Sequence, residues 1–133
     1  MNRLFALLLR LPRWTLTALC TAAIVYLTLV PKPLPDNDIQ FWEHTDKIVH
    51  AIMFGGLYFC VALDLWRGKR PPTRRILAPA LSVAAFGALI EILQQSMGMG
   101  RGGSLGDFAA DVAGVALTVL MLSCIQNRQA RRP

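Results

Sequence analysis

The sequence has few of the features on which small secreted or zinc-binding domains depend. Its three cysteines, Cys20, Cys60 and Cys124, stand singly in three different apolar segments. This spacing indicates neither a disulfide framework nor a zinc-binding pair. Charged residues are also scarce, at 17% of the 133 residues. A chain of this length leaves no room for a soluble catalytic module beside the apolar segments, so we expect one domain, residues 1–133.

Acidic residues are the scarcer charged type, and the formal net charge is +6. A single basic patch on a soluble fold would favour nucleic-acid binding. In this chain the basic residues lie in short segments beside apolar ones, where such charges fix orientation and contact anionic lipid. Nucleic-acid binding is therefore excluded, and membrane lipids are the expected partners.

Apolar residues make up 54% of the chain and are grouped into four blocks. A membrane-spanning helix needs about 20 predominantly apolar residues. The sequence therefore predicts an all-α membrane protein with four transmembrane helices in a compact bundle, and a short basic, amphipathic segment before the first helix. No A-x-A-like cleavage site follows the first block, so we interpret it as a retained span. The expected spans are residues 14–30, 47–65, 76–95 and 106–125.

The distribution of lysine and arginine predicts the orientation. Three of the fourteen basic residues precede the first block, five lie between the second and third blocks, and three follow the fourth. Only Lys32, Lys47 and Arg101 lie on the other side. By the positive-inside rule we expect both termini to be cytoplasmic.

Residues 91–114 hold the most informative polar residues. Glu91, Asp107 and Asp111 lie at the facing ends of two apolar runs, and ionisable residues at such depth in lipid are costly and commonly functional. Residues four apart share a helix face, as Asp107 and Asp111 do. With the expected topology, the polar residues of three helices meet at one membrane level and form a pocket that opens outward. The expected ligand-binding residues are Asp46, Lys47, His50, Glu91, Gln94, Arg101, Ser104, Asp107 and Asp111.

Structural roles compete with binding at several of these positions. Asp46 and Asp107 suit helix N-termini, and Ser104-x-x-Asp107 has capping-box spacing. Further inward, Asp64 lies beside Trp66 and Arg67, so we expect it to be a surface carboxylate near the inner interface. The glycines between residues 98 and 106 follow no strand and lack the lysine of a phosphate-binding loop.

The order of Asp46-Lys47-x-x-His50, Glu91-x-x-Gln94, Arg101, Ser104, Asp107 and Gly114 resembles the VanZ-like family of small bacterial membrane proteins. The resemblance extends from about residue 39 to residue 122. It implies a four-helix membrane bundle and, from the family's namesake, low-level resistance to the glycopeptide teicoplanin. The family pattern usually has asparagine where this chain has Asp111, which makes the predicted pocket more acidic.

Three functions remain open from the sequence. The first is a binding protein without assigned catalytic residues or cofactor, which holds an envelope lipid headgroup, a cell-wall precursor or a glycopeptide. The second is a membrane-embedded hydrolase with a divalent metal on His50, Glu91, Asp107 and Asp111. The third is an ion or proton transporter, for which the sequence offers no polar route through the middle of the membrane. Small residues share a helix face with these carboxylates, namely Ala80, Ala84 and Ala88 with Glu91, and Gly114 with Asp107 and Asp111. Such stripes let helices approach closely in lipid, and they suit a homo-oligomer as well as a monomer.

Overall fold

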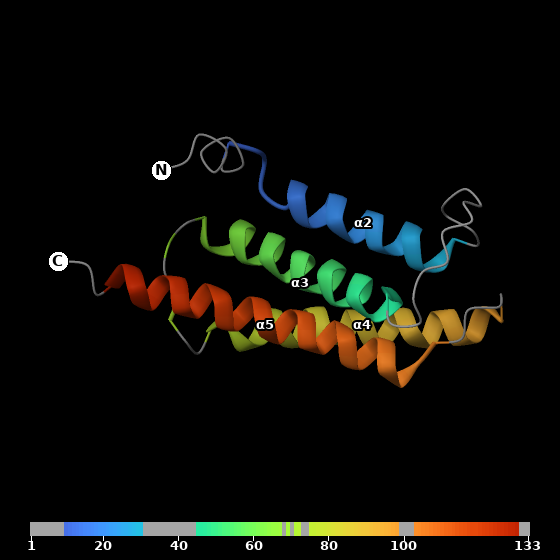
Figure 1. The fold of residues 1–133 in the computed structure, drawn as a ribbon. Coiled ribbons are helices and arrows are strands. Elements are labelled where there is room, and N and C mark those ends of the chain that lie inside the picture. The colour runs from blue at the N-terminus through green and yellow to red at the C-terminus, as the bar shows by residue number, and fades with distance from the viewer. Residues whose placement is uncertain are drawn as a thin grey trace.

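The computed structural model describes residues 10–30, 45–67, 69, 71–72, 75–98 and 103–130, with side chains up to residue 128. Within these residues every regular element is a helix: α2 (Thr15–Leu29), α3 (Thr45–Trp66), α4 (Leu77–Met97) and α5 (Leu105–Ala130). Successive helices run in opposite directions, so α2 begins and α5 ends at the same end of the bundle (Figure 1). Helix α3 contacts all three of the others and packs most extensively against α5.

Three helices, α3, α4 and α5, are long and apolar enough to cross a membrane. Helix α2 is also apolar but has only 15 residues, which corresponds to a rise of about 22 Å. The helix ends lie within two residues of the predicted bounds, except that α5 continues to Ala130 instead of ending near residue 125. The all-helical fold is thus confirmed for the described residues, with three of the four expected spans long and apolar enough to cross a membrane. Most of the predicted amphipathic segment lies outside the described residues.

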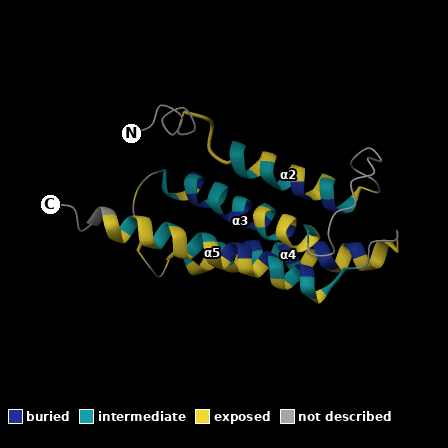
Figure 2. Cartoon of the chain, in the orientation of Figure 1, coloured by how far each residue is buried: buried dark blue, intermediate teal, exposed yellow. Residues whose placement is uncertain are grey.

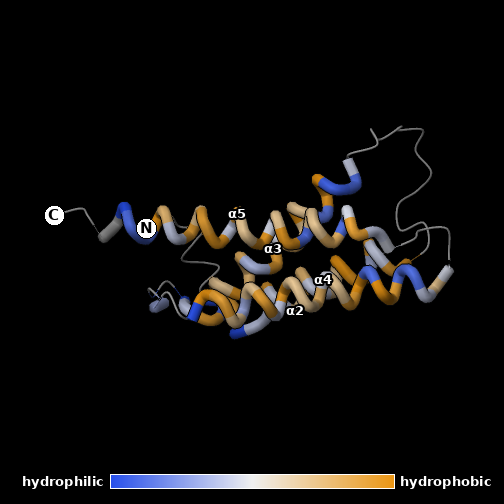
Figure 3. Tube along the Cα trace, turned by 90° about the horizontal axis from the view of Figure 1, so that it is seen from below, coloured by the Kyte–Doolittle hydropathy of each residue, from blue (hydrophilic) through white to orange (hydrophobic). Residues whose placement is uncertain are grey.

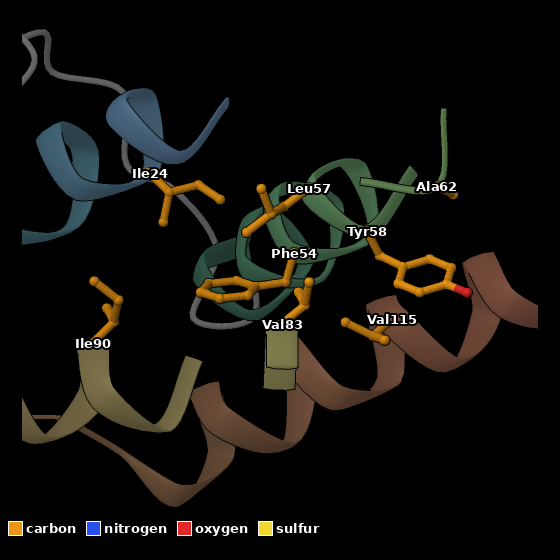
Figure 4. Close-up of a cluster of buried hydrophobic side chains, with 8 residues drawn as sticks. All are labelled: Ile24, Phe54, Leu57, Tyr58, Ala62, Val83, Ile90 and Val115. Atoms are coloured by element: carbon orange, nitrogen blue, oxygen red, sulfur yellow. The ribbon is translucent and has the colours of Figure 1, made fainter. Parts of the chain in front are cut away.

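The core is a layer of apolar side chains between the two ends of the bundle. Phe54 lies at its centre and is completely buried, with Ile24, Val83, Ile90 and Val115 approaching from the other three helices (Figure 4). Exposed residues occupy the outward faces of the helices (Figure 2). The hydropathy pattern shows that hydrophobic residues dominate the middle of the helices while hydrophilic ones gather toward the ends (Figure 3). An apolar exterior of this kind is expected for helices that face lipid.

Glycine allows the α3–α5 pair to pack closely. A Cβ atom at Gly114 would overlap the backbone carbonyl oxygen of Ala51, and one at Gly55 would lie 2.9 Å from the carbonyl oxygen of Gly114. Small residues permit such close approach of helices in lipid, as expected for Gly114 from the sequence. The closest contacts are made by Ala51 and Gly55 of α3, and because Ala51 directly follows His50, they fix the position of His50 against α5.

Asp64 has a role that differs from the sequence expectation. It is only 6% exposed, so the expectation of a surface carboxylate is wrong. Its Oδ2 atom accepts hydrogen bonds from the Thr17 backbone N–H (3.3 Å) and from the Thr17 hydroxyl (2.7 Å). Trp14, the residue at the N-cap of α2, makes no side-chain capping bond. Asp64 on α3 therefore caps the N-terminus of α2.

Candidate functional site

A buried cluster of one histidine and two carboxylates lies at the end of the bundle where α3 and α5 begin and α4 ends. His50 Nδ1 is 2.9 Å from Asp111 Oδ1 and 3.7 Å from Glu91 Oε1. The side chains are 6%, 0% and 9% exposed for His50, Asp111 and Glu91 respectively. The His50 ring stacks on Phe54, with ring centroids 6.4 Å apart, so the cluster rests directly on the apolar core.

Glu91 also connects the cluster to the N-terminus of α5. Its Oε2 atom accepts a hydrogen bond of 2.8 Å from the backbone N–H of Ser104. The Ser104 hydroxyl in turn accepts the N–H of Asp107 at 3.1 Å, which confirms half of the predicted capping box. In a complete capping box the side chain three residues after the cap would bind the Ser104 N–H. Glu91 binds this N–H, and the carboxylate of Asp107 is left to face the cluster and Lys47.

Lys47 lies on the more exposed side of the site. Its Nζ atom is 3.9 Å from Asp107 Oδ1, and its side chain is 47% exposed. A Cβ atom at Gly106 would meet Lys47 Cε at 2.9 Å, so the lysine stem lies across the first turn of α5. Asp46, in the first turn of α3, is exposed. A series of polar side chains thus leads from Lys47 through Asp107 to the buried cluster.

Two carboxylate oxygens in the cluster have no hydrogen-bond partner: Glu91 Oε1 and Asp111 Oδ2. Asp111 Oδ2 lies over Gly87 of α4, where a Cβ atom would come within 2.9 Å of it. Buried polar atoms are nearly always paired in folded proteins, because leaving one unpaired costs about 1–3 kcal/mol. The described side chains therefore leave two acceptor atoms of the cluster without a hydrogen-bond donor.

Metal-ligand chemistry is present in two overlapping groups. Ligand atoms of His50, Glu91 and Asp111 all lie within 4.8 Å of one another, and the same is true of Asp46, His50 and Asp107. His50 belongs to both groups. The first group is fully buried, whereas the second includes the exposed Asp46. Together they include all four residues of the predicted metal set.

The structure brings together most, but not all, of the predicted ligand-binding residues. Gln94 is buried, but its amide donates a 2.9 Å hydrogen bond to the Thr28 carbonyl oxygen and so joins α4 to α2. Arg101 lies outside the described residues. The outward-opening pocket itself stays a prediction. The residues that the structure gathers at this end of the bundle are Asp46, Lys47, His50, Glu91, Ser104, Asp107 and Asp111.

The sequence did not single out two glycines that shape the site. Gly87 leaves space for Asp111, and a Cβ atom at Gly103 would overlap the backbone carbonyl oxygen of Glu91. Gly87 lies four residues before Glu91 on the same helix face, so the spacing rule could have identified it. Gly103 lies among five loop glycines that no sequence pattern distinguishes.

The buried cluster is separated from Asp64 by apolar packing. Phe54, Leu57, Tyr58 and Ala62 of α3 lie between His50 and Asp64, and all four are buried. Within the described residues, the buried imidazole and the buried carboxylate of α3 thus lie toward opposite ends of the bundle. This arrangement does not favour a transport path.

Fold and site define an all-helical protein with three helices long and apolar enough to cross a membrane and with a buried histidine–carboxylate cluster at one end of the bundle. Comparison with protein-family models, with curated proteins and with solved structures finds no match.

Proposed function

We propose that the chain is a VanZ-like protein of the bacterial inner membrane whose polar cluster binds the phosphate-bearing headgroup of an envelope lipid or of a lipid-linked cell-wall precursor. The observation that carries this proposal is the position of exposed Lys47 beside the first turn of α5, at the entrance to the buried polar cluster. Ionisable groups at such a position in a membrane protein commonly serve function. The resemblance to the VanZ-like family adds envelope homeostasis or glycopeptide resistance as the cellular role.

Lys47 and the N-terminus of α5 provide the binding elements for phosphate. The N–H groups of Leu105 and Gly106 belong to the first turn of α5, where no intrahelical acceptor is available. Lys47 lies directly beside them, with Nζ 3.6 Å from the position of a Cβ atom at Gly106. Free N–H groups at a helix N-terminus together with a nearby ammonium group favour an anion. The lysine would then exchange its contact with Asp107, at 3.9 Å, for a contact with phosphate.

The proposed orientation places this site toward the outer leaflet. It rests on the excess of lysine and arginine beside the other end of the bundle, where α3 ends and α4 begins. Both termini are then cytoplasmic, and the ligand is a lipid of the outer leaflet or a precursor exported to it.

Native mass spectrometry of the full-length protein, purified in mild detergent from bacterial membranes, tests the proposal. We expect a phosphate-containing lipid or precursor to copurify with the wild-type protein and to be lost from Lys47→Gln. The matched control is Lys69→Gln, which removes an exposed lysine near the other end of the bundle. If all three proteins retain the same lipids in the same amounts, the headgroup site does not exist.

A metal-dependent hydrolase is the second candidate, and the clustering of His50, Glu91 and Asp111 ligand atoms within 4.8 Å favours it. Such an enzyme would cleave the bound headgroup instead of only holding it. Incubation of the purified protein with phospholipid and with lipid-linked cell-wall precursor, in the presence of divalent ions, distinguishes the two. Release of a headgroup that Glu91→Gln abolishes would establish hydrolysis, whereas recovery of intact lipid supports binding alone.

A further inference from the structure

We propose that His50, Glu91 and Asp111 bind one divalent metal ion, which neutralises the buried carboxylates beneath the headgroup site. The ion site follows from these three side chains alone. Its relation to a phosphate rests on the proposed function.

The distances between the candidate ligand atoms fit one metal ion. Ligands about 2.1 Å from an ion lie roughly 3.0 Å apart at octahedral angles and roughly 3.4 Å apart at tetrahedral angles. His50 Nδ1 is 2.9 Å from Asp111 Oδ1 and 3.7 Å from Glu91 Oε1. The two measured separations lie just below and just above these ideal ligand–ligand distances. Shifts of a few tenths of an ångström in side-chain position are therefore enough to place the three ligand atoms around one ion.

The unpartnered oxygens provide an independent observation that points to a ligand. Glu91 Oε1 and Asp111 Oδ2 have no hydrogen-bond partner, and both side chains are at least nine-tenths buried. Glu91 Oε1 is the oxygen that faces His50, since Oε2 is already bonded to the Ser104 N–H. A cation bound by His50 Nδ1, Asp111 Oδ1 and Glu91 Oε1 would satisfy the unpaired oxygen of Glu91, and bidentate binding by Asp111 would satisfy Oδ2 as well.

The surrounding charge also favours a cation. Asp107 is buried and belongs, with Asp46, to a second group of ligand atoms around His50. Four carboxylates therefore surround one imidazole, and the nearby basic group of the described residues, Lys47, is half-exposed and close only to Asp107. A buried, uncompensated negative charge is costly, and a divalent ion reduces it without removing any hydrogen bond to the backbone.

The donor set identifies the class of ion. One imidazole nitrogen with carboxylate oxygens suits Mn²⁺, Fe²⁺ or Zn²⁺, because soft copper(I) prefers sulfur and Ca²⁺ prefers oxygen ligands throughout. Coordination through Nδ1 requires the imidazole tautomer that carries its proton on Nε2. A metal-bound histidine commonly donates its other ring N–H to a carboxylate, and carboxylate oxygens of Asp46 and Asp107 lie within 4.8 Å of a His50 ring nitrogen.

The test measures binding of the metal alone to the full-length protein. Purified protein is treated with a chelator, transferred to chelator-free detergent and titrated with Mn²⁺, with free ion followed by electron paramagnetic resonance and with Zn²⁺ competition. We expect one Mn²⁺ per chain and a loss of affinity on the order of tenfold or more in Asp111→Asn and in Glu91→Gln. The Asp111→Asn side chain keeps an oxygen that can accept a hydrogen bond from His50 Nδ1, so we expect this variant to fold. Asp64→Asn, at an equally buried carboxylate remote from the cluster, should bind Mn²⁺ as the wild type does.

A shared proton between Glu91 and Asp111 is the competing explanation for the two unpaired oxygens. It predicts that the wild type binds no Mn²⁺ or Zn²⁺, or binds them as weakly as the two variants, and either result would overturn the metal site. Lys47-dependent lipid retention, measured on the same preparations, is then still expected. Failure of the ion site is thereby distinguished from failure of the headgroup site.

Discussion

Replacing Gly114 by alanine should force α3 and α5 apart and disrupt the cluster between them. The new Cβ atom would overlap the Ala51 carbonyl oxygen, which is backbone and cannot rotate away. The two helices must therefore separate, on the order of 1 Å, to restore ordinary contact. Ala51 directly follows His50, and Asp111 precedes Gly114 by one turn, so the same movement lengthens their 2.9 Å hydrogen bond.

The expected loss of stability comes from two opposing effects. Overpacking of a close helix contact costs about 1–3 kcal/mol, and a broken hydrogen bond between buried partners costs a similar amount. Alanine in place of glycine returns about 1 kcal/mol of helix propensity. The net change is a destabilisation of roughly 3 kcal/mol.

Unfolding of the purified protein in mixed micelles with increasing sodium dodecyl sulfate, followed by circular dichroism, measures this difference. Gly56→Ala is the matched control, because a Cβ atom at Gly56 meets nothing within 4 Å. Its stability should be unchanged or higher by up to about 1 kcal/mol. Equal stability of the Gly114→Ala and Gly56→Ala variants would refute the close α3–α5 crossing and its role in positioning His50.

Three further substitutions test the remaining contacts, two by the same unfolding measurement and one by Mn²⁺ binding. Asp64→Ala should destabilise the protein by about 1–3 kcal/mol, because Thr17 loses the acceptor that caps α2, and wild-type stability would show that the cap is unimportant. Gly87→Ala should displace Asp111 and weaken Mn²⁺ binding with little loss of helix, so unchanged affinity would argue against the site. Gly98→Ala should cost about 1 kcal/mol, because Gly98 ends α4 with φ of 59°, and a neutral effect would contradict this left-handed cap.

The helices could be predicted from the sequence because apolar blocks of membrane-spanning length are separated by charged segments. The exception is the end of α5, which continues to Ala130 through Gln126, Asn127 and Arg128. Hydropathy marks only the apolar part of a helix. The polar residues beyond it remain helical because backbone hydrogen bonding does not stop at the membrane boundary.

The position of the site along the bundle axis could also be predicted, because successive helices run in opposite directions and bring the start of α3, the end of α4 and the start of α5 together. Which neighbour each side chain contacts could not be predicted. Glu91 and Gln94 are three residues apart and were expected in one pocket, yet Glu91 faces α5 and Gln94 faces α2. A separation of three residues rotates the side chain by about 60° around the helix, enough to reach a different neighbour. Only the helix packing decides between them.

Asp64 and Glu91 together show how a structural carboxylate differs from one that is available to a ligand. Each accepts the backbone N–H at the N-terminus of a neighbouring helix, α2 for Asp64 and α5 for Glu91. The bonded oxygen of Asp64 also receives the Thr17 hydroxyl, and neither Asp64 oxygen is a buried atom without a partner. In Glu91 one oxygen makes the capping hydrogen bond, and the other is buried, unpaired and 3.7 Å from His50 Nδ1. Asp111 also has one buried oxygen without a hydrogen-bond partner. Helix capping therefore explains the buried carboxylate of Asp64. It explains only one of the two carboxylate oxygens of Glu91, and the other oxygen is the strongest reason to assign a ligand to this end of the bundle.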